Sequence, residues 1–172
     1  VPPKGYLNRL RKICDKHGIL LIFDEVITGW GRTGSPFAAQ EFNVTPDIMT
    51  LAKATTNGVV PMGVVAVRDG IYDAVINSAP EGAIELFHGY TYSGIPAAVA
   101  AALAVQDIFE KENIFNRVKE ITPYFQEALH SLNDLECVEN IRGYGLLGGV
   151  DIKKKDKPGK AGFQVYKSCY EN

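Results

Sequence analysis

Cysteine is scarce in this sequence, and its scarcity excludes one class of protein. The 172 residues contain only Cys14, Cys137 and Cys169, which are odd in number and far apart. A small disulfide-bonded scaffold carries a denser framework of paired cysteines. We therefore expect three free thiols in an intracellular, cytoplasmic protein.

Long runs of one chemical character are also missing. The longest apolar run, residues 95–106, is too short and too rich in alanine to span a bilayer. The formal net charge is −2 and there is no long basic run, so we expect neither nucleic acid nor an anionic membrane as partner. The three histidines share no ligand spacing with the cysteines, and we predict no metal site.

The composition that remains is typical of a packed globular chain, with 46% hydrophobic and 22% charged residues. An amphipathic helix is predicted after the prolines at the start of the chain, with Gly18 as its stop. The apolar run 19–23 follows at once and predicts a buried parallel strand, as in α/β proteins. Further strands are predicted over 48–52 and 62–67.

The second half of the chain shows longer helical patterns. Residues 96–109 are apolar nearly all round, which predicts a buried helix. Residues 115–132 show amphipathic spacing, with a kink expected at Pro123. The glycine-rich stretch 138–152 is typical of strands.

The organisation of the chain indicates two parts of a larger whole. We expect a domain boundary near Asn113, which divides residues 1–112 from residues 113–172. The chain starts without methionine, and residues 168–172 resemble a helix cut in its first turns. We therefore expect a piece of a longer protein.

Two residues at strand ends could carry chemistry together. Asp24 follows the first apolar strand and Lys53 follows the second. In open α/β sheets, ligands bind in the crevice outside the carboxyl ends of the strands. A lysine there can form an imine and a carboxylate can keep a pyridine nitrogen protonated, which is the pair that pyridoxal phosphate (PLP) needs. Two alternatives stay open: Asp24 caps the next turn, or Lys53 is a surface lysine or pairs with Glu25.

The glycine-rich segment 29–34 (GWGRTG) matches the dinucleotide-binding pattern G-x-G-x-x-G in letters only. That pattern needs a strand leading directly into the glycines and a full helix opening from them. Here five positions separate the strand from Gly29, and Asp47 stands before its strand rather than after it. We interpret the segment as a loop at the rim of an active site.

Three segments carry a family resemblance, in this order: residues 22–34 (IFDEVITGWGRTG), residues 45–63 with TPDIMTLAKA, TNG and PMG, and residues 87–94 (FHGYTYSG). Together they resemble the central signature of class III aminotransferases, which are PLP enzymes of fold type I. The resemblance covers nearly the whole chain and weakens after Val150. Within the family the chain looks most like the ω-amino acid (β-alanine type):pyruvate aminotransferases.

The resemblance implies a fold and an activity. The fold class is α/β: residues 1–112 belong to the PLP-binding large domain, a mostly parallel sheet with flanking helices. Residues 113–172 begin an α+β C-terminal small domain. The implied reaction moves an amino group from an ω-amino acid or amine, β-alanine-like, to a keto acid such as pyruvate. An aminomutase or a decarboxylase on the same scaffold is the nearest alternative, and a catalytically silent structural relative is another.

The resemblance also implies a role for individual residues. Asp24 would bond the pyridine nitrogen, Val26 would pack on one face of the ring, and Lys53 would form the Schiff base and later move the proton. Thr91, with the backbone near Tyr90, would bind the phosphate of the cofactor in the partner subunit of a homodimer.

The sequence departs from the family at two positions, and it lacks three larger features of the family. Ile95 stands where the family commonly has histidine, and Ala54 where it has glycine. The upstream phosphate loop, the ring-stacking aromatic residue and the downstream arginine for the substrate carboxylate are absent. We therefore expect these 172 residues to be inactive by themselves.

Overall fold

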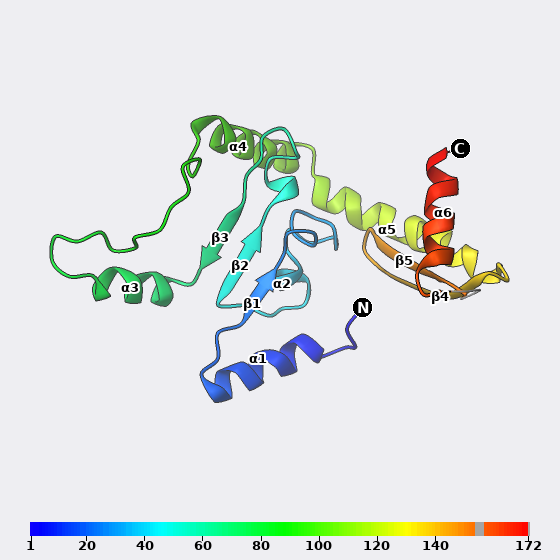
Figure 1. Ribbon diagram of the computed structural model, residues 1–172, viewed down its shortest axis with the longest axis horizontal. Coiled ribbons are helices and arrows are strands. Elements are labelled where there is room, and N and C mark those ends of the chain that lie inside the picture. Colours follow the sequence, from blue (N-terminus) through cyan, green and yellow to red (C-terminus); the bar gives the residue numbers. More distant parts are fainter. Residues whose placement is uncertain (154–156, 172) are drawn as a thin grey trace.

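The computed structural model describes residues 1–153 and 157–171. Helices and strands alternate in the first part of the chain and a hairpin follows in the second (Figure 1). In chain order the elements are α1 (Tyr6–His17), β1 (Ile22–Asp24), α2 (Ala38–Glu41), β2 (Ile48–Leu51), the 3-10 turn η1 (Lys53–Thr55), β3 (Val64–Val67), α3 (Asp69–Ser78), α4 (Pro96–Lys111), α5 (Ile114–His130), the 3-10 turn η2 (Ser131–Asp134), β4 (Val138–Tyr144), β5 (Leu147–Ile152) and α6 (Lys160–Glu171).

The strands β1, β2 and β3 form one sheet in that order. β1 pairs with β2 in parallel, with Asp24 beside Thr50, and β2 pairs with β3 in the antiparallel direction. The prediction of a parallel pair is confirmed for β1 and β2. The sheet within this chain is nevertheless mixed, because β3 runs back along β2.

The first strand begins three residues later than predicted. α1 ends at His17, and Gly18 takes the left-handed conformation (φ 61°) that closes the helix, as the sequence predicted. The N–H of Ile19 then donates to the carbonyl of Cys14 (2.9 Å), and the N–H of Leu21 donates to Asp47 Oδ2 (2.7 Å). These bonds engage the N–H groups of Ile19 and Leu21, and the regular ladder of β1 starts at Ile22.

The carboxylate of Asp47 ties α1 to the sheet. Besides the bond from Leu21 it accepts one from Arg11 Nη1 (2.6 Å), and Arg68 Nη1 lies 3.1 Å from its other oxygen. The bond from the N–H of Leu21, followed by that from Arg11, holds the pKa of the Asp47 carboxyl below its usual range. Both oxygens are engaged in holding the fold, so Asp47 is not placed to bind a ribose.

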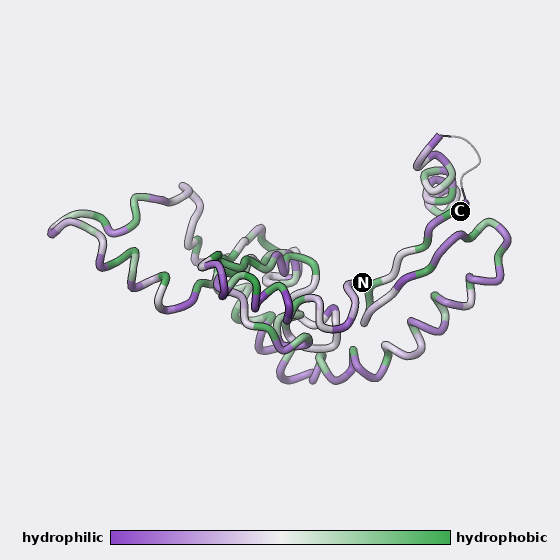
Figure 2. The backbone as a smooth tube through the Cα atoms, turned by 90° about the horizontal axis from the view of Figure 1, so that it is seen from below, coloured by the Kyte–Doolittle hydropathy of each residue, from purple (hydrophilic) through white to green (hydrophobic). Residues whose placement is uncertain are grey.

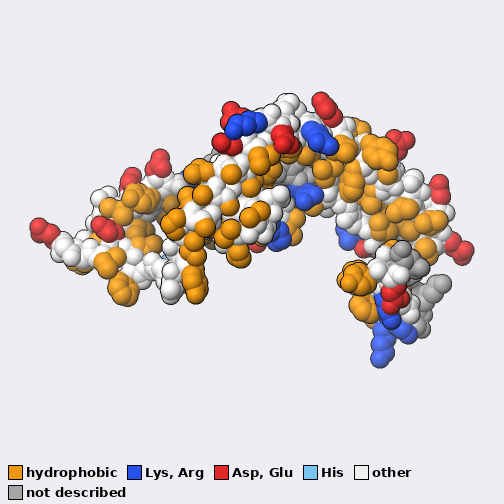
Figure 3. Space-filling view, turned by 90° about the horizontal axis from the view of Figure 1, so that it is seen from above, with side chains coloured by type: hydrophobic (Ala, Val, Ile, Leu, Met, Phe, Trp, Pro, Cys, Tyr) orange, Lys and Arg blue, Asp and Glu red, His pale blue; other side chains and the backbone are white. Residues whose placement is uncertain are grey.

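The prediction of deeply buried elements is wrong for this chain. Ile22 in β1 is 56% exposed and Val65 in β3 is 64% exposed. Along α4 only the stripe of Ala98, Ala102 and Val105 is buried, while Leu103 on another face is 59% exposed. Apolar side chains accordingly lie open on the surface (Figure 3). Periodicity identifies residues that favour burial, but it does not report which segment covers them.

The second part of the chain packs a helix on a hairpin, at the end of the molecule opposite α3 (Figures 1 and 2). α5 continues through Pro123 to His130, and β4 and β5 pair in the antiparallel direction. The helix lies so close to the strands that a side chain at two glycines would not fit. A Cβ at Gly143 would meet Gln126 Oε1, and one at Gly148 would meet the side chain of Leu129. The predictions of a helix and of strands over these residues are confirmed.

Candidate functional site

Asp24 and Lys53 lie at the same end of the sheet, where β1 and β2 finish, as the sequence predicted. Asp24 is the last residue of β1, and Lys53 follows β2 by one residue. β1 and β2 run in the same direction, and the N–H of Glu25 continues the ladder to the carbonyl of Thr50 (2.9 Å). An amine and a carboxylate therefore stand at the carboxyl ends of two adjacent parallel strands.

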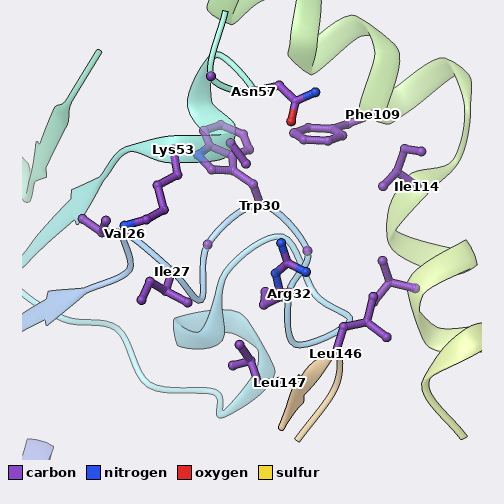
Figure 4. A pocket seen from close by; sticks show the side chains of 15 residues that line it. Val26, Ile27, Trp30, Arg32, Lys53, Asn57, Phe109, Ile114, Leu146 and Leu147 are labelled. Atoms are coloured by element: carbon purple, nitrogen blue, oxygen red, sulfur yellow. The ribbon is translucent and has the colours of Figure 1, made fainter. Parts of the chain in front are cut away.

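Lys53 occupies an unusual backbone conformation. Its φ is +48°, in the left-handed region that residues with a side chain seldom adopt. Thr55 closes the turn around it, because its N–H and its hydroxyl both donate to the carbonyl of Ala52, each at 3.0 Å. The side chain of Lys53 extends from this turn toward Val26 (Figure 4).

The alternative in which Lys53 pairs with Glu25 is wrong. Glu25 is only 1% exposed, and its carboxylate accepts bonds from the N–H groups of Ala38 and Ala39, both at 2.7 Å, and from the hydroxyl of Thr28 at 3.0 Å. These partners use both oxygens of Glu25 to anchor the start of α2. Among the described residues, Lys53 forms no ion pair, so its amine is available for chemistry.

Asp24 caps the next turn with one carboxylate oxygen and leaves the other available for a ligand. Its Oδ1 accepts the N–H of Val26 at 3.1 Å, which caps the turn after β1. Its Oδ2 has no hydrogen-bond partner in the described part of the chain, and the residue is exposed. One oxygen therefore fixes the carboxylate and the other can accept a bond from a ligand.

A cavity of about 690 Å³ lies beside these residues. Figure 4 shows Lys53 and Val26 on one side of it and Phe109, Ile114 and Leu146 on the other. Residues 29–32 of the glycine-rich loop form part of its wall, as expected for a loop at the rim of a site. Asp24 stands outside this cavity, so a ring held between Asp24 and Lys53 would lie at its edge.

The C-terminal hairpin supplies one wall of the cavity. The N–H of Leu146 donates to the carbonyl of Arg32 (2.9 Å), and the hydroxyl of Tyr144 donates to Glu41 Oε1 (2.7 Å). Burial of the hydroxyl, together with its bond to Glu41, raises the pKa of Tyr144 to about 12. The first bond docks the hairpin on the glycine-rich loop and the second docks it on α2, and together they bring Leu146 and Leu147 to the cavity.

Tyr90 and Thr91 are not brought together with Lys53. Both lie exposed in the long segment between α3 and α4, which projects from the body of the molecule (Figure 1). The N–H of Ser93 donates to the carbonyl of Tyr90 (2.9 Å), and the N–H of Tyr90 donates to the hydroxyl of Ser93. Thr91 does not cap α4, whose first cap residue is Ile95 without a side-chain bond. The hydroxyl of Thr91 is therefore not used to hold the start of its own helix.

Sequence reasoning missed several residues around the site. Trp30 donates from Nε1 to Thr55 Oγ1 (2.9 Å), and Phe109 stacks on its ring. Leu146 and Leu147 reach the cavity from more than ninety residues beyond Lys53. A large aromatic residue inside a glycine-rich loop could have indicated that Trp30 has a structural role. No feature of the local sequence indicated that Leu146 and Leu147 reach the cavity.

Residues 1–153 and 157–171 contain neither a metal-binding cluster nor a membrane-spanning helix. Over these ranges, histidine, cysteine, aspartate and glutamate side chains form no group of three that could hold a metal ion. No helix in the same ranges has the length and apolar character needed to cross a membrane.

Known proteins resemble the chain along nearly its whole length. The omega-aminotransferase of Caulobacter vibrioides is 49% identical over 172 residues, which cover 99% of this chain and 39% of that protein. The beta-alanine–pyruvate aminotransferase of Pseudomonas aeruginosa is 49% identical over 176 residues, with the same shares. The chain thus spans about two fifths of the length of these relatives.

Solved structures and a family model agree with these relatives. The crystal structure of taurine:2-oxoglutarate aminotransferase from Bifidobacterium kashiwanohense, in complex with PLP and glutamate, matches with a TM-score of 0.89 at 35% identity, over 99% of this chain and 40% of that one. The predicted α/β fold of the PLP-dependent transaminases is thereby confirmed. The family model for aminotransferase class-III matches residues 1–168. This chain belongs to the class III aminotransferase family.

Proposed function

We propose that the full-length protein transfers an amino group from an ω-amino acid or amine, such as β-alanine, to a keto acid such as pyruvate, with PLP as cofactor. One observation carries the proposal. Asp24 and Lys53 stand at the carboxyl ends of adjacent parallel strands, and within the described residues one carboxylate oxygen and the amine have no partner. The names of the relatives at 49% identity support the substrate class.

The residues at this edge fit the cofactor. Asp24 Oδ2 can accept a bond from a protonated ring nitrogen, and Val26 offers an apolar contact between the two polar groups. Lys53 Nζ extends toward Val26 and can bond covalently to an aldehyde carbon (Figure 4). PLP, when bound, supplies an electron-withdrawing ring that stabilises negative charge at the substrate carbon bearing the amino group.

Lys53 and Asp24 would divide the proton chemistry between them. Once its amine is free, Lys53 Nζ would take the proton from the substrate carbon that bears nitrogen and deliver it to the former aldehyde carbon, on the other side of that nitrogen. The negative charge of Asp24 keeps a proton on the ring nitrogen, and its bond to the N–H of Val26 keeps the carboxylate in place. Apolar side chains, among them Phe109 and Leu146, face this base across the cavity.

An assay of keto-acid dependence tests the proposal against its alternatives. With β-alanine and pyruvate, the full-length enzyme should form one alanine for each β-alanine consumed. When no keto acid is present, release of CO₂ would instead identify a decarboxylase, and migration of the amino group would identify an aminomutase. A purified protein that is colourless and inactive with every amine would contradict an enzymatic role.

We also propose the larger organisation that the resemblance implies. A boundary near Asn113 divides the PLP-binding large domain, residues 1–112, from the start of the small domain, residues 113–172. Asn113 supports this boundary, because it takes a left-handed conformation (φ 51°) between α4 and α5. The three described cysteines are all free, which supports a cytoplasmic location.

We propose that the protein is a homodimer in which Thr91 and the backbone near Tyr90 bind the phosphate of the partner subunit's cofactor. The projection of this segment away from Lys53 of its own chain supports an action in another subunit (Figure 1). Loss of the Thr91 hydroxyl should weaken cofactor affinity by roughly 10- to 100-fold, the effect of about 1.5–3 kcal/mol for a bond to a charged group.

Heterodimers with Lys53→Ala in one chain and Thr91→Ala in the other test this assignment. The chain that keeps Lys53 then receives Thr91 from its partner, so that one site should bind PLP with near-normal affinity in an equilibrium titration. Affinity as weak as in the Thr91→Ala homodimer would place the action of Thr91 within its own subunit.

A further inference from the structure

The indole of Trp30 reaches the turn that carries Lys53. Trp30 Nε1 donates to Thr55 Oγ1 at 2.9 Å, and Thr55 is only 2% exposed. The same hydroxyl donates onward to the carbonyl of Ala52 at 3.0 Å. A continuous chain of hydrogen bonds therefore connects Trp30 with the peptide group immediately before Lys53.

The turn needs such support because Lys53 is held in a strained conformation. A residue with a side chain at φ +48° is less stable there by about 1–2 kcal/mol, and such conformations persist where the surroundings enforce them. The carbonyl of Ala52 accepts two bonds, and both come from Thr55. The orientation of Thr55 thus bears directly on the conformation of Lys53.

Trp30 is itself fixed on several sides, so it can serve as an anchor. Its backbone is left-handed (φ 61°), and its N–H donates to the carbonyl of Pro36 at 2.6 Å. Its ring stacks on Phe109 with centroids 5.9 Å apart and meets the ring of Phe37 edge-on at 5.2 Å. Figure 4 shows the indole between the Lys53 turn and Phe109.

We propose that Trp30 and Thr55 act as a pair of positioning residues that hold the amine of Lys53 in place for covalent attachment to the cofactor aldehyde. The inference rests on the proposed function of Lys53 as the attachment site. Trp30 touches neither the amine nor the reacting atoms, and it acts through the hydroxyl of Thr55 on the peptide before Lys53. The pair should therefore affect how fast Lys53 reacts more than whether the protein folds.

The test uses the full-length apoenzyme with Trp30→Phe, Thr55→Val and the double variant. Phenylalanine keeps an aromatic ring beside Phe109 but removes the indole donor, and valine keeps the shape of threonine but removes the hydroxyl. The measurement is the rate of covalent attachment of added PLP to Lys53, followed by absorbance and verified by borohydride reduction and peptide mapping. Each single variant should slow attachment by about tenfold, which corresponds to about 1.4 kcal/mol.

Coupling between the two sites distinguishes positioning from general destabilisation. If the residues act as a unit, the double variant should be no slower than the slower single variant, and Thr55→Ser should restore the rate to within about twofold. Thr56→Val is the matched control, because Thr56 is equally buried but its hydroxyl donates to the carbonyl of Val60. Its effect should be smaller and should add to that of Trp30→Phe.

Two outcomes would overturn the inference. Rates that fall no further in Trp30→Phe and Thr55→Val than in Thr56→Val would show only the loss of a buried hydrogen bond. Fully additive effects in the double variant would show that the two residues act separately. If instead the unmodified protein attaches PLP to a different lysine or to none, the proposed function fails, and this result is distinct from both.

Discussion

We expect Lys53→Ala to lower the turnover of the full-length enzyme by a factor of about 10²–10⁴, the usual contribution of a positioned general base. The substitution removes the only amine that extends from this turn toward Val26 in the described part of the site. The measurement is single-turnover amino transfer from β-alanine at saturating PLP, so that weakened cofactor binding does not contribute. Methylamine added in solution should restore part of the rate, because a free amine can replace the missing base.

Two controls make the Lys53 result specific. Lys12→Ala removes an exposed lysine from α1 and should leave turnover unchanged. Lys53→Arg keeps the positive charge but cannot bond the aldehyde at neutral pH, so it should be as slow as alanine. Arginine supplies no base of its own, so any response to methylamine would come from the added amine alone. Borohydride reduction of the unmodified enzyme should leave the pyridoxyl group on Lys53. A label on another lysine would contradict the assignment.

Asp24→Asn should slow proton abstraction by roughly a hundredfold or more, while the fold is retained. A charged hydrogen bond at such a site contributes about 2–4 kcal/mol to the reaction barrier. Asparagine keeps an oxygen that can accept the N–H of Val26, so the turn cap seen at 3.1 Å survives and only the charge is lost. The measurement is the primary isotope effect and rate with β-alanine deuterated at the carbon bearing nitrogen.

Asp24→Ala separates the capping role from the electrostatic one. If the charge matters, asparagine and alanine should be similarly slow, and only alanine should also lower Tm by the loss of the cap. If Asp24 serves only as a cap, asparagine should turn over normally and alanine should not. Asp107→Asn, at an exposed site on α4, is the matched control and should change neither quantity.

The positions of Asp24 and Lys53 could be predicted because each depends on local sequence. Apolar runs predicted strands near both, and a strand that ends in a polar residue places that residue at the sheet edge. The parallel pairing of β1 and β2 then brought the two edges together. Prediction was less accurate at the start of β1, because the bond from Leu21 to Asp47 joins residues far apart in the sequence.

Other features of the site depended on contacts that no local pattern encodes. Glu25 follows Asp24 directly, yet its carboxylate turns inward to Ala38 and Ala39 rather than toward Lys53. The hydrogen bond between Trp30 and Thr55 spans 25 residues. Periodicity reports which face of an element is apolar, and it does not report which distant side chain completes a hydrogen bond.

The family and most of the helices and strands could be predicted from the amino-acid sequence alone, and so could two candidate site residues, Asp24 and Lys53. Motifs and strand ends are local properties, and they remain readable without a structure. The strained conformation of Lys53, its support through Thr55, and the bond of Tyr144 to Glu41 across 103 residues become evident only in the folded chain. These features arise when the chain folds back on itself, because the geometry of a long-range contact depends on every turn between its two ends.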